Sequence, residues 1–267
     1  MTHMPGTLLA IVLASLAGGV LSTLVAGATL RLPASWVPRL VSFAVGALLG
    51  AVFLDLLPEA LEQTTPRTVM LTVLAGLLGF FLREKLVLWR HAHGHELHEP
   101  DADESEHDHA LHGHGGIGSR PGLMILIGNG VHSFCDGIVI ASAFLADLRL
   151  GIATTIAIVA HAVPQQVGDF AVLLHSGFTR RKAFAFNVAV GLATLAGALA
   201  AYGALAHMQR ALPIALAFAG ASLLYVAVAD LIPSLHRRPE PIETAGQMIA
   251  IGLGLGVIAA AHLALEA

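Results

Sequence analysis

Long runs of apolar residues, separated by short polar breaks, dominate the chain. A helix needs about 20 mostly apolar residues to cross a bilayer, so each run of that length predicts one membrane span. Eight runs qualify, and they cover residues 6–28, 40–61, 68–88, 122–146, 150–175, 183–206, 213–235 and 242–264. The predicted fold class is therefore all-α, a polytopic membrane protein with eight transmembrane helices.

The polar breaks predict how the chain is organised. The links between spans are short, except for one long polar stretch between the third and the fourth span. We expect transmembrane helices 1–3 in residues 1–90, a histidine-rich cytoplasmic loop in residues 91–120, and helices 4–8 in residues 121–267. All eight helices are expected to form one membrane domain.

Lys and Arg residues fall unevenly on the two sides of the membrane that eight spans define. Arg67, Arg149 and Arg210 lie on one side. Eleven lie on the other side, namely Arg31, Arg39, Arg83, Lys85, Arg90, Arg120, Arg180, Arg181, Lys182, Arg237 and Arg238. Because loops rich in Lys and Arg stay in the cytoplasm, the larger set marks the cytoplasmic face. The pattern predicts a multi-pass protein of the cell membrane (inner or plasma membrane) with both termini outside.

Composition narrows the class of protein further. Of the 267 residues, 56% are apolar and 12% are charged, and the formal net charge is −4. Soluble domains average about 25% charged residues, so the lipid bilayer is an expected partner and nucleic acid is not. The single cysteine, Cys135, excludes an intrachain disulfide and any four-cysteine zinc site.

The long loop is rich in both histidine and acidic residues. It carries seven acidic residues between Glu96 and Asp108 and eight histidines, namely His91, His93, His95, His98, His107, His109, His112 and His114. Such a segment has little to bury and is predicted to be disordered. It is either a solvated linker or a weak, multi-site binder of metal ions, because neutral imidazole is a common zinc ligand.

Spans two and seven contain similar sequences. Residues 43–58 and 218–233 align over sixteen positions without a gap, and both end in Asp-Leu-(Leu/Ile)-Pro, at Asp55 and Asp230. The two spans cross in opposite directions, so the repeat is inverted, as in many secondary transporters. It would relate helices 1–3 to helices 6–8 and leave helices 4 and 5 as a central pair. Chance similarity between two apolar sequences is the alternative.

Ionisable residues inside a span are energetically costly, so each one is a candidate for function. Span four carries His132 and Asp136, four residues apart on one helix face, and span five carries His161 with polar residues at the same spacing. Such ligands on adjacent helices predict a divalent transition-metal site, although histidines in membrane helices also form interhelical hydrogen bonds. The candidate metal ligands are His132, Ser133, Asp136, His161, Gln165, Gln166 and Asp169.

Two motifs carry a family resemblance. His132-Ser-Phe-Cys-Asp136-Gly137 and His161-Ala-Val-Pro164-Gln-Gln-Val-Gly168-Asp169-Phe170 resemble the paired motifs of the ZIP (Zrt/Irt-like) divalent metal transporters. The nearest form is the subfamily whose fifth helix reads His-Glu-x-Pro-His-Glu-x-Gly-Asp-Phe. The resemblance implies a 3+2+3 inverted-repeat bundle, a homodimer, metal bound between helices 4 and 5, and uptake toward the cytoplasm by an elevator-like motion of helices 1, 4, 5 and 6.

The chain departs from that subfamily at several ligand positions. Gln165 and Gln166 stand where the subfamily has His and Glu, and span six offers only Asn187 and Thr194, with no carboxylate to bridge a second metal. An amide oxygen is a neutral and weaker ligand than a carboxylate. We therefore expect one metal rather than two, bound more weakly than in such relatives, and tighter zinc binding after Gln166→Glu.

Further polar residues outline a path for the metal. Asp55 and Glu59 near the outer end of span two are candidates for an entrance, and Asp230 with His236 for an exit near the inner end of span seven. Ordinary interfacial carboxylates are the alternative for each. His262, near the outer end of span eight, is expected to be interfacial.

These features predict transmembrane transport of a divalent transition metal into the cytoplasm. Zinc is the favoured substrate, with Fe²⁺, Mn²⁺ and Cd²⁺ as alternatives, and no organic cofactor is expected. The protein is not expected to be an enzyme, because residues 161–165 lack the Glu and the second His of a His-Glu-x-x-His zinc protease. A metal-efflux antiporter, which is expected to have about six spans, and a transport-impaired metal sensor are the remaining alternatives.

Overall fold

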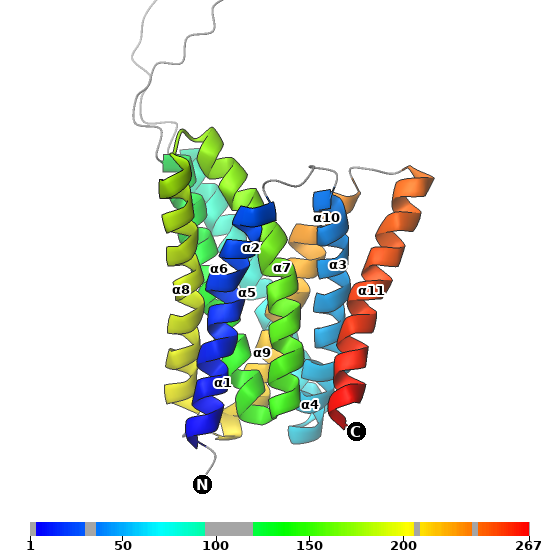
Figure 1. Ribbon diagram of the computed structural model, residues 1–267. Helices are drawn as coiled ribbons and strands as arrows, with labels where there is room; N and C mark the ends of the chain where they lie inside the picture. Colours follow the sequence, from blue (N-terminus) through cyan, green and yellow to red (C-terminus); the bar gives the residue numbers. More distant parts are fainter. Residues whose placement is uncertain (1–3, 30–35, 94–119, 206–208, 237–239, 267) are drawn as a thin grey trace, which may run out of the picture.

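The computed structural model describes residues 4–29, 36–93, 120–205, 209–236 and 240–266, which form eight helical rods (Figure 1). Each predicted span overlaps one rod, which confirms the all-α polytopic fold. By length and composition, seven of the rods qualify as membrane spans; the other is α5, which carries Arg83, Glu84 and Lys85. The rods are α1 (Met4–Leu16), η1 (Ala17–Leu21) and α2 (Ser22–Thr29); α3 (Val37–Gly50), η3 (Ala51–Leu56) and α4 (Leu57–Gln63); α5 (Pro66–His93); α6 (Arg120–Ala146); α7 (Leu148–His175); α8 (Arg180–Leu205); η4 (Gln209–Ala211), α9 (Leu212–Tyr225), η5 (Val226–Leu231) and α10 (Ile232–Leu235); and α11 (Pro241–Glu266).

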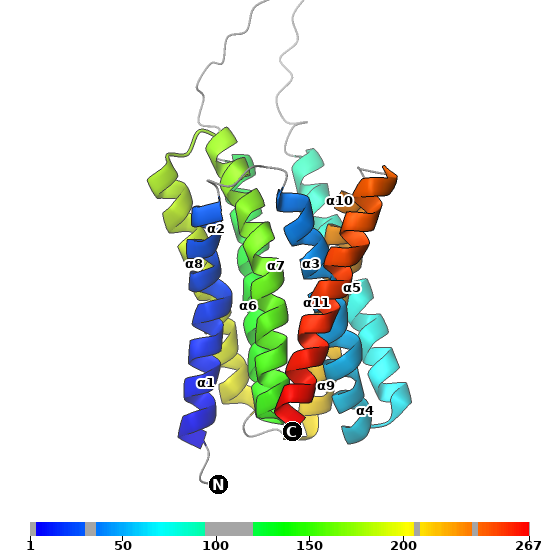
Figure 2. The ribbon, with the colours of Figure 1, turned by 45° about the vertical axis from the view of Figure 1, so that its right-hand side comes forward.

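The rods run up and down, so that α1 begins and α11 ends at the same end of the bundle (Figures 1 and 2). We call this the terminal end. At the opposite end, which we call the loop end, α5 ends and α6 begins. Because α5 continues through His93, His91 and His93 belong to that helix and not to the predicted loop. The other six predicted loop histidines lie in residues 94–119, outside the described residues.

The inverted repeat is visible in the boundaries of the helices. The elements from α3 to α5 match those from α9 to α11, and equivalent elements start 175 residues apart. The paired first residues are Val37 and Leu212, Ala51 and Val226, and Pro66 and Pro241. The α3–α4 rod runs from the loop end to the terminal end, and the α9–α10 rod runs the other way (Figure 1). The repeat therefore extends well beyond the sixteen aligned positions, which argues against chance similarity.

Each repeat presents its aspartate on the same local structure. Asp55 lies in the π-helical segment η3, just before Pro58, and Asp230 lies in the π-helical segment η5, just before Pro233. A π turn inserts an extra residue into a helix and is often found at functional sites. Proline lacks the N–H group that would bond the preceding turn. Both features weaken the regular helix beside the aspartate.

Glycines allow two pairs of helices to pack with their backbones in contact. A side chain at Gly137 or Gly197 would overlap the backbone of the facing helix in the α6–α8 pair, and the same holds for Gly46 and Gly254 in the α3–α11 pair. Small residues serve this purpose in membrane bundles. The first pair belongs to a unit of the α1–α2 rod, α6, α7 and α8; the second belongs to a unit of the α3–α4 rod, α5, the α9–α10 rod and α11. The two units meet where α3 packs on α7 and α6 packs on α9.

Candidate metal site

Three side chains from the central helix pair meet inside the bundle. His132 and Asp136 lie one turn apart on α6, and His161 faces them from α7. The His132 Nε2 atom lies 3.4 Å from His161 Nε2 and 3.6 Å from the Asp136 Oδ2 atom, which in turn lies 3.4 Å from His161 Nε2. All three residues are buried. Among the described residues, they form one group of potential metal ligands whose atoms all lie within 4.8 Å of one another.

The size of this triangle suits a tetrahedral metal ion. Zinc binds histidine nitrogen and carboxylate oxygen at about 2.0–2.2 Å, and two ligands of a tetrahedron with such bonds lie about 3.3–3.6 Å apart. The three observed distances fall in or close to that range. The three atoms can therefore occupy one face of a tetrahedron and leave the fourth position for another ligand.

A further contact orients the histidine of α7. The His161 Nδ1 atom lies 3.2 Å from the backbone oxygen of Ala157, one turn earlier in the helix. A histidine that donates its Nδ1 proton to a carbonyl carries the lone pair on Nε2, the atom that faces His132 and Asp136. The second carboxylate oxygen of Asp136 is buried without a hydrogen-bond partner among the described residues. Both features fit a ligand set for a cation.

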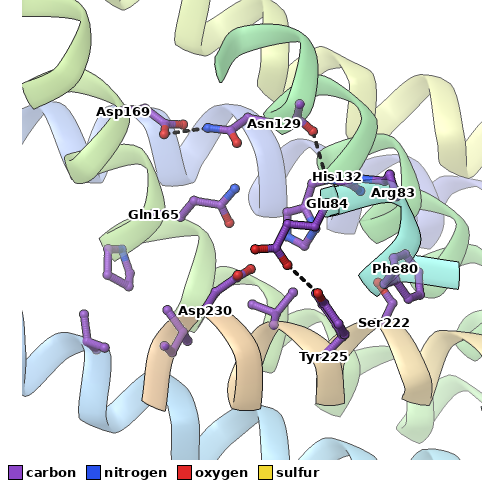
Figure 3. A pocket seen from close by; sticks show the side chains of 15 residues that line it. Phe80, Arg83, Glu84, Asn129, His132, Gln165, Asp169, Ser222, Tyr225 and Asp230 are labelled. Carbon is purple, nitrogen blue, oxygen red and sulfur yellow. Dashed lines mark hydrogen bonds between the residues drawn. The ribbon is translucent and has the colours of Figure 1, made fainter. Parts of the chain in front are cut away.

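A cavity of about 420 Å³ adjoins the triangle, and His132 lines it. Gln165 projects into this cavity from α7 between Asp169 and Asp230 (Figure 3). The lining residues belong to the parts of α3, α5, α6, α7 and the α9–α10 rod that lie toward the loop end. On the other side of the triangle, toward the terminal end, the helices bury apolar side chains such as Ile140, Ile158 and Val52. The cavity therefore lies on the loop-end side of the triangle, and buried apolar side chains lie on its terminal-end side.

Comparison with known proteins decides the family. A sequence model of the family described as ZIP Zinc transporter matches residues 4–262. The chain belongs to the ZIP zinc transporter family. Zinc transporter ZIP13 of Homo sapiens is 30% identical over 257 residues, which are 82% of this chain and 69% of the relative. Zinc transporter ZIP13 of Pongo abelii is 30% identical over 235 residues (82% and 65%), and Zinc transporter ZIP4 of Homo sapiens is 31% identical over 251 residues (75% and 39%).

The match confirms the predicted family and, with it, the predicted class of divalent-metal transporter. The antiporter alternative, with about six spans, does not fit the eight rods.

The remaining predicted ligands of this ZIP protein have different surroundings. Gln166 points away from the cavity, and its Nε2 atom donates to the Gly19 oxygen of η1 at 3.3 Å. Asp169 lines the cavity and accepts a hydrogen bond from Asn129 at 2.5 Å. Ser133 is buried on α6 next to His132. The structure thus groups three of the seven candidates, directs Gln165 and Asp169 into the adjoining cavity, and gives Gln166 a different partner.

The predicted exit has other neighbours than the sequence suggested. Asp230 lines the cavity, whereas His236 is exposed at the end of α10 and is not part of the cavity wall. Glu84 of α5 faces Asp230 across the cavity and accepts a hydrogen bond from the Tyr225 hydroxyl (Figure 3). Arg83 donates to the Gly128 oxygen of α6 at 3.4 Å. Sequence reasoning missed Glu84 and Tyr225, which are 141 residues apart.

The predicted entrance lies in a second cavity of about 350 Å³ near the terminal end. Asp55 is 4% exposed there, and its Oδ1 atom lies 2.7 Å from the Nδ1 atom of His262 on α11. His262 is therefore more than the interfacial residue that the sequence suggested. The wall of this cavity consists of Leu54, Asp55, Pro58, Glu59, Glu62, Asp147, Arg149, Leu150 and His262. Four of these nine residues are acidic, a composition that favours cations.

Proposed function

We propose that this protein carries zinc, or a similar divalent transition metal, across the membrane into the cytoplasm through His132, Asp136 and His161. The observation that carries the proposal is the triangle of ligand atoms, with sides of 3.4–3.6 Å, at the inner wall of a cavity. A substrate site must hold the ion and still release it. One open tetrahedral position beside a cavity meets that requirement, because a water molecule or the Gln165 side chain can complete the shell and leave again.

The donor set supports a transition metal as the substrate. Two imidazole nitrogens and one carboxylate suit zinc and related ions, whereas Mg²⁺ and Ca²⁺ prefer all-oxygen shells. Fe²⁺, Mn²⁺ and Cd²⁺ remain alternative substrates. A single ion is proposed, since the described residues of span six provide Asn187 and Thr194 but no carboxylate for a second metal.

The charges at the two ends support uptake as the direction of transport. The excess of Lys and Arg beside the loop end favours its assignment to the cytoplasm. The terminal end is then outside, where the acidic cavity around Asp55 and Glu59 would collect cations. Ions released from His132 would leave past Asp230 and Glu84. The described conformation is accordingly proposed to face inward.

The proposal also covers the contact of the protein with lipid and its assembly into a homodimer. The faces of α5 and α11 expose large apolar side chains, such as Leu74, Leu78 and Leu253, which suits contact with lipid in the cell membrane. The resemblance to the ZIP family implies a homodimer, and it implies that the unit of α1–α2, α6, α7 and α8 moves against the other unit during transport.

Zinc uptake into proteoliposomes tests the proposal directly. We expect the purified wild-type protein to carry zinc into liposomes that contain a zinc-sensitive dye. His161→Ala should reduce the rate of zinc uptake to that of liposomes without protein. Ser142→Ala is the matched control, because Ser142 is also buried, on α6. Among the described residues, its hydroxyl donates a hydrogen bond to the Ile138 oxygen, one turn earlier in the same helix. The control should transport like the wild type.

Two results would contradict the proposal. Unchanged zinc uptake by His161→Ala would show that the triangle does not bind the transported ion. Zinc binding by the wild type without uptake would favour the alternative of a transport-impaired sensor.

A further inference from the structure

Gln166 joins α7, which carries His161, to the α1–α2 rod of the same unit. Its side chain leaves α7 and donates from Nε2 to the Gly19 oxygen at 3.3 Å, a contact between residues 147 positions apart. Gln166 is 4% exposed, so this hydrogen bond is shielded from solvent. A hydrogen bond in such a place has few competitors and constrains both helices.

The acceptor owes its position to the local structure of the first rod. Gly19 lies in the π-helical segment η1, where the regular ladder of the helix is interrupted. Its carbonyl oxygen accepts a second side-chain hydrogen bond, from the Thr23 hydroxyl at 3.0 Å. On its other side Gly19 packs directly against the backbone of Gly191 on α8, with no room for a side chain. The acceptor is therefore fixed with respect to both α1 and α8.

The neighbouring glutamine, Gln165, points in a different direction. Successive residues of an α-helix point about 100° apart, and Gln165 lines the cavity beside His132 (Figure 3). Rotation of α7 that brought Gln166 toward the cavity would turn Gln165 out of it. It would also move the His161 ring away from Asp136, because His161 belongs to the same helix.

We propose that Gln166 is a positioning residue for metal binding and not a ligand. Its hydrogen bond to Gly19 fixes the rotation of α7 about its axis, so that His161 faces Asp136 and Gln165 faces the cavity. The inference rests on the proposed role of the triangle as the metal site. It also explains why an amide is suitable here: a glutamate carboxylate has no proton to donate to the Gly19 carbonyl and would bring two oxygens together in a buried place. This reverses the expectation that Gln166→Glu tightens zinc binding.

Metal affinity and metal geometry, measured side by side, test this role. The experiment uses the full-length protein in detergent, a zinc competition titration, and the visible absorption bands of bound Co²⁺, which report tetrahedral coordination. Gln166→Met keeps the length of the side chain and removes the donor. We expect it to weaken zinc binding about tenfold or more, as for other groups that orient a ligand, and to change the Co²⁺ spectrum.

Thr23→Val is the matched control, because it removes the other side-chain donor to the same carbonyl and leaves α7 untouched. We expect it to lower the melting temperature about as much as Gln166→Met but to bind zinc within about twofold of the wild type. If Gln166→Met and Thr23→Val lose the same zinc affinity, Gln166 stabilises the fold in general and does not position the metal ligands. Unchanged affinity in Gln166→Met would also overturn the proposal.

His161→Ala, measured in the same titration, separates this inference from the proposed function. If His161→Ala binds zinc as the wild type does, the triangle is not the site. If it loses zinc while Gln166→Met retains it, the site stands and only the positioning role is wrong.

Discussion

Asp55 and Asp230 occupy equivalent positions of an inverted repeat, yet their surroundings differ. Both lie in a π-helical segment that precedes a proline. Asp55 is 4% exposed and bonded to His262, in a cavity at the terminal end. Asp230 is exposed and shares the larger cavity with His132. The local sequence therefore sets how each aspartate is presented, and the packing of the two units decides whether it communicates with the metal site.

This difference indicates how an alternate state could arise. In transporters built on inverted repeats, exchange of the two repeat conformations opens one side of the site and closes the other. Here the closed side contains the buried apolar residues Val52, Ile140 and Ile158, and the open side contains the cavity. An outward-facing state would separate these apolar side chains and connect Asp55 to His132.

The largest expected effect is in the sidedness of chemical labelling. Val41 and Leu54 lie on one rod, the first in the wall of the loop-end cavity and the second in the wall of the terminal-end cavity. In a Cys135→Ser background, we expect Val41→Cys to react with a membrane-impermeant thiol reagent only from the cytoplasm. Leu54→Cys should react only from outside. Labelling of intact cells and of inverted vesicles measures both.

Two labelling results would contradict the proposed orientation in the membrane. Reaction of both cysteines from the same side would refute the proposed orientation of the α3–α4 rod. Exchange of the two sides would place the termini in the cytoplasm and reverse the proposed direction of uptake. The Cys135→Ser parent is the control for background labelling.

Neutralising the two aspartates should have unequal effects on uptake. Asp55→Asn removes the charge from a buried hydrogen bond, a class of interaction worth about 1.5–3 kcal/mol, so we expect the initial rate at low zinc to fall about tenfold or more. Asp230→Asn should lower the rate only about threefold, because Glu84 and Asp169 still provide charge in the same cavity and exposed charges contribute less than about 1 kcal/mol each.

The control is Glu243→Gln, which removes one exposed acid from the first turn of α11 and should leave the rate unchanged. Equal losses in the two aspartate variants would mean that burial does not distinguish the two ends. A larger loss for Asp230→Asn would contradict the proposed order of entrance and exit.

Much of this molecule is encoded locally and could be predicted from the sequence. Runs of apolar residues determine the eight rods, and the four-residue spacing of His132 and Asp136 determines that they share a helix face. The shared Asp-Leu-(Leu/Ile)-Pro sequence indicates the inverted repeat. These features depend on residues close together in the chain, so a pattern of spacing is sufficient to find them.

Other features depend on how the helices are rotated and packed, which spacing does not report. His262 approaches Asp55 across 207 positions, and neither residue has a neighbour in the sequence that indicates the pair. Gln165 and Gln166 look equivalent in the sequence, and only the contact of α7 with Gly19 separates them. The π-helical segments likewise share no local signal, because a proline follows η3 and η5 within two residues but does not follow η1 in this way.

A smaller effect than that of Asp55→Asn is expected at the wall of the loop-end cavity. Gln165 lines this cavity beside His132, so Gln165→Glu would add a negative charge next to the open position of the triangle. An extra charge about 4 Å from an ion contributes about 1 kcal/mol or more even where water screens it, so we expect zinc binding to tighten about fivefold. Release into the cavity should slow in proportion, and uptake at saturating zinc should fall.

Gln165→Met separates the charge from the shape of the side chain, because it keeps the length and removes the amide oxygen. We expect it to bind zinc more weakly than the wild type in the same competition titration. Tighter binding in both variants would mean that the amide hinders the ion and is no ligand. Weaker binding in Gln165→Glu would contradict the assignment of Gln165 to the cavity side of α7, since a carboxylate there can only attract the metal.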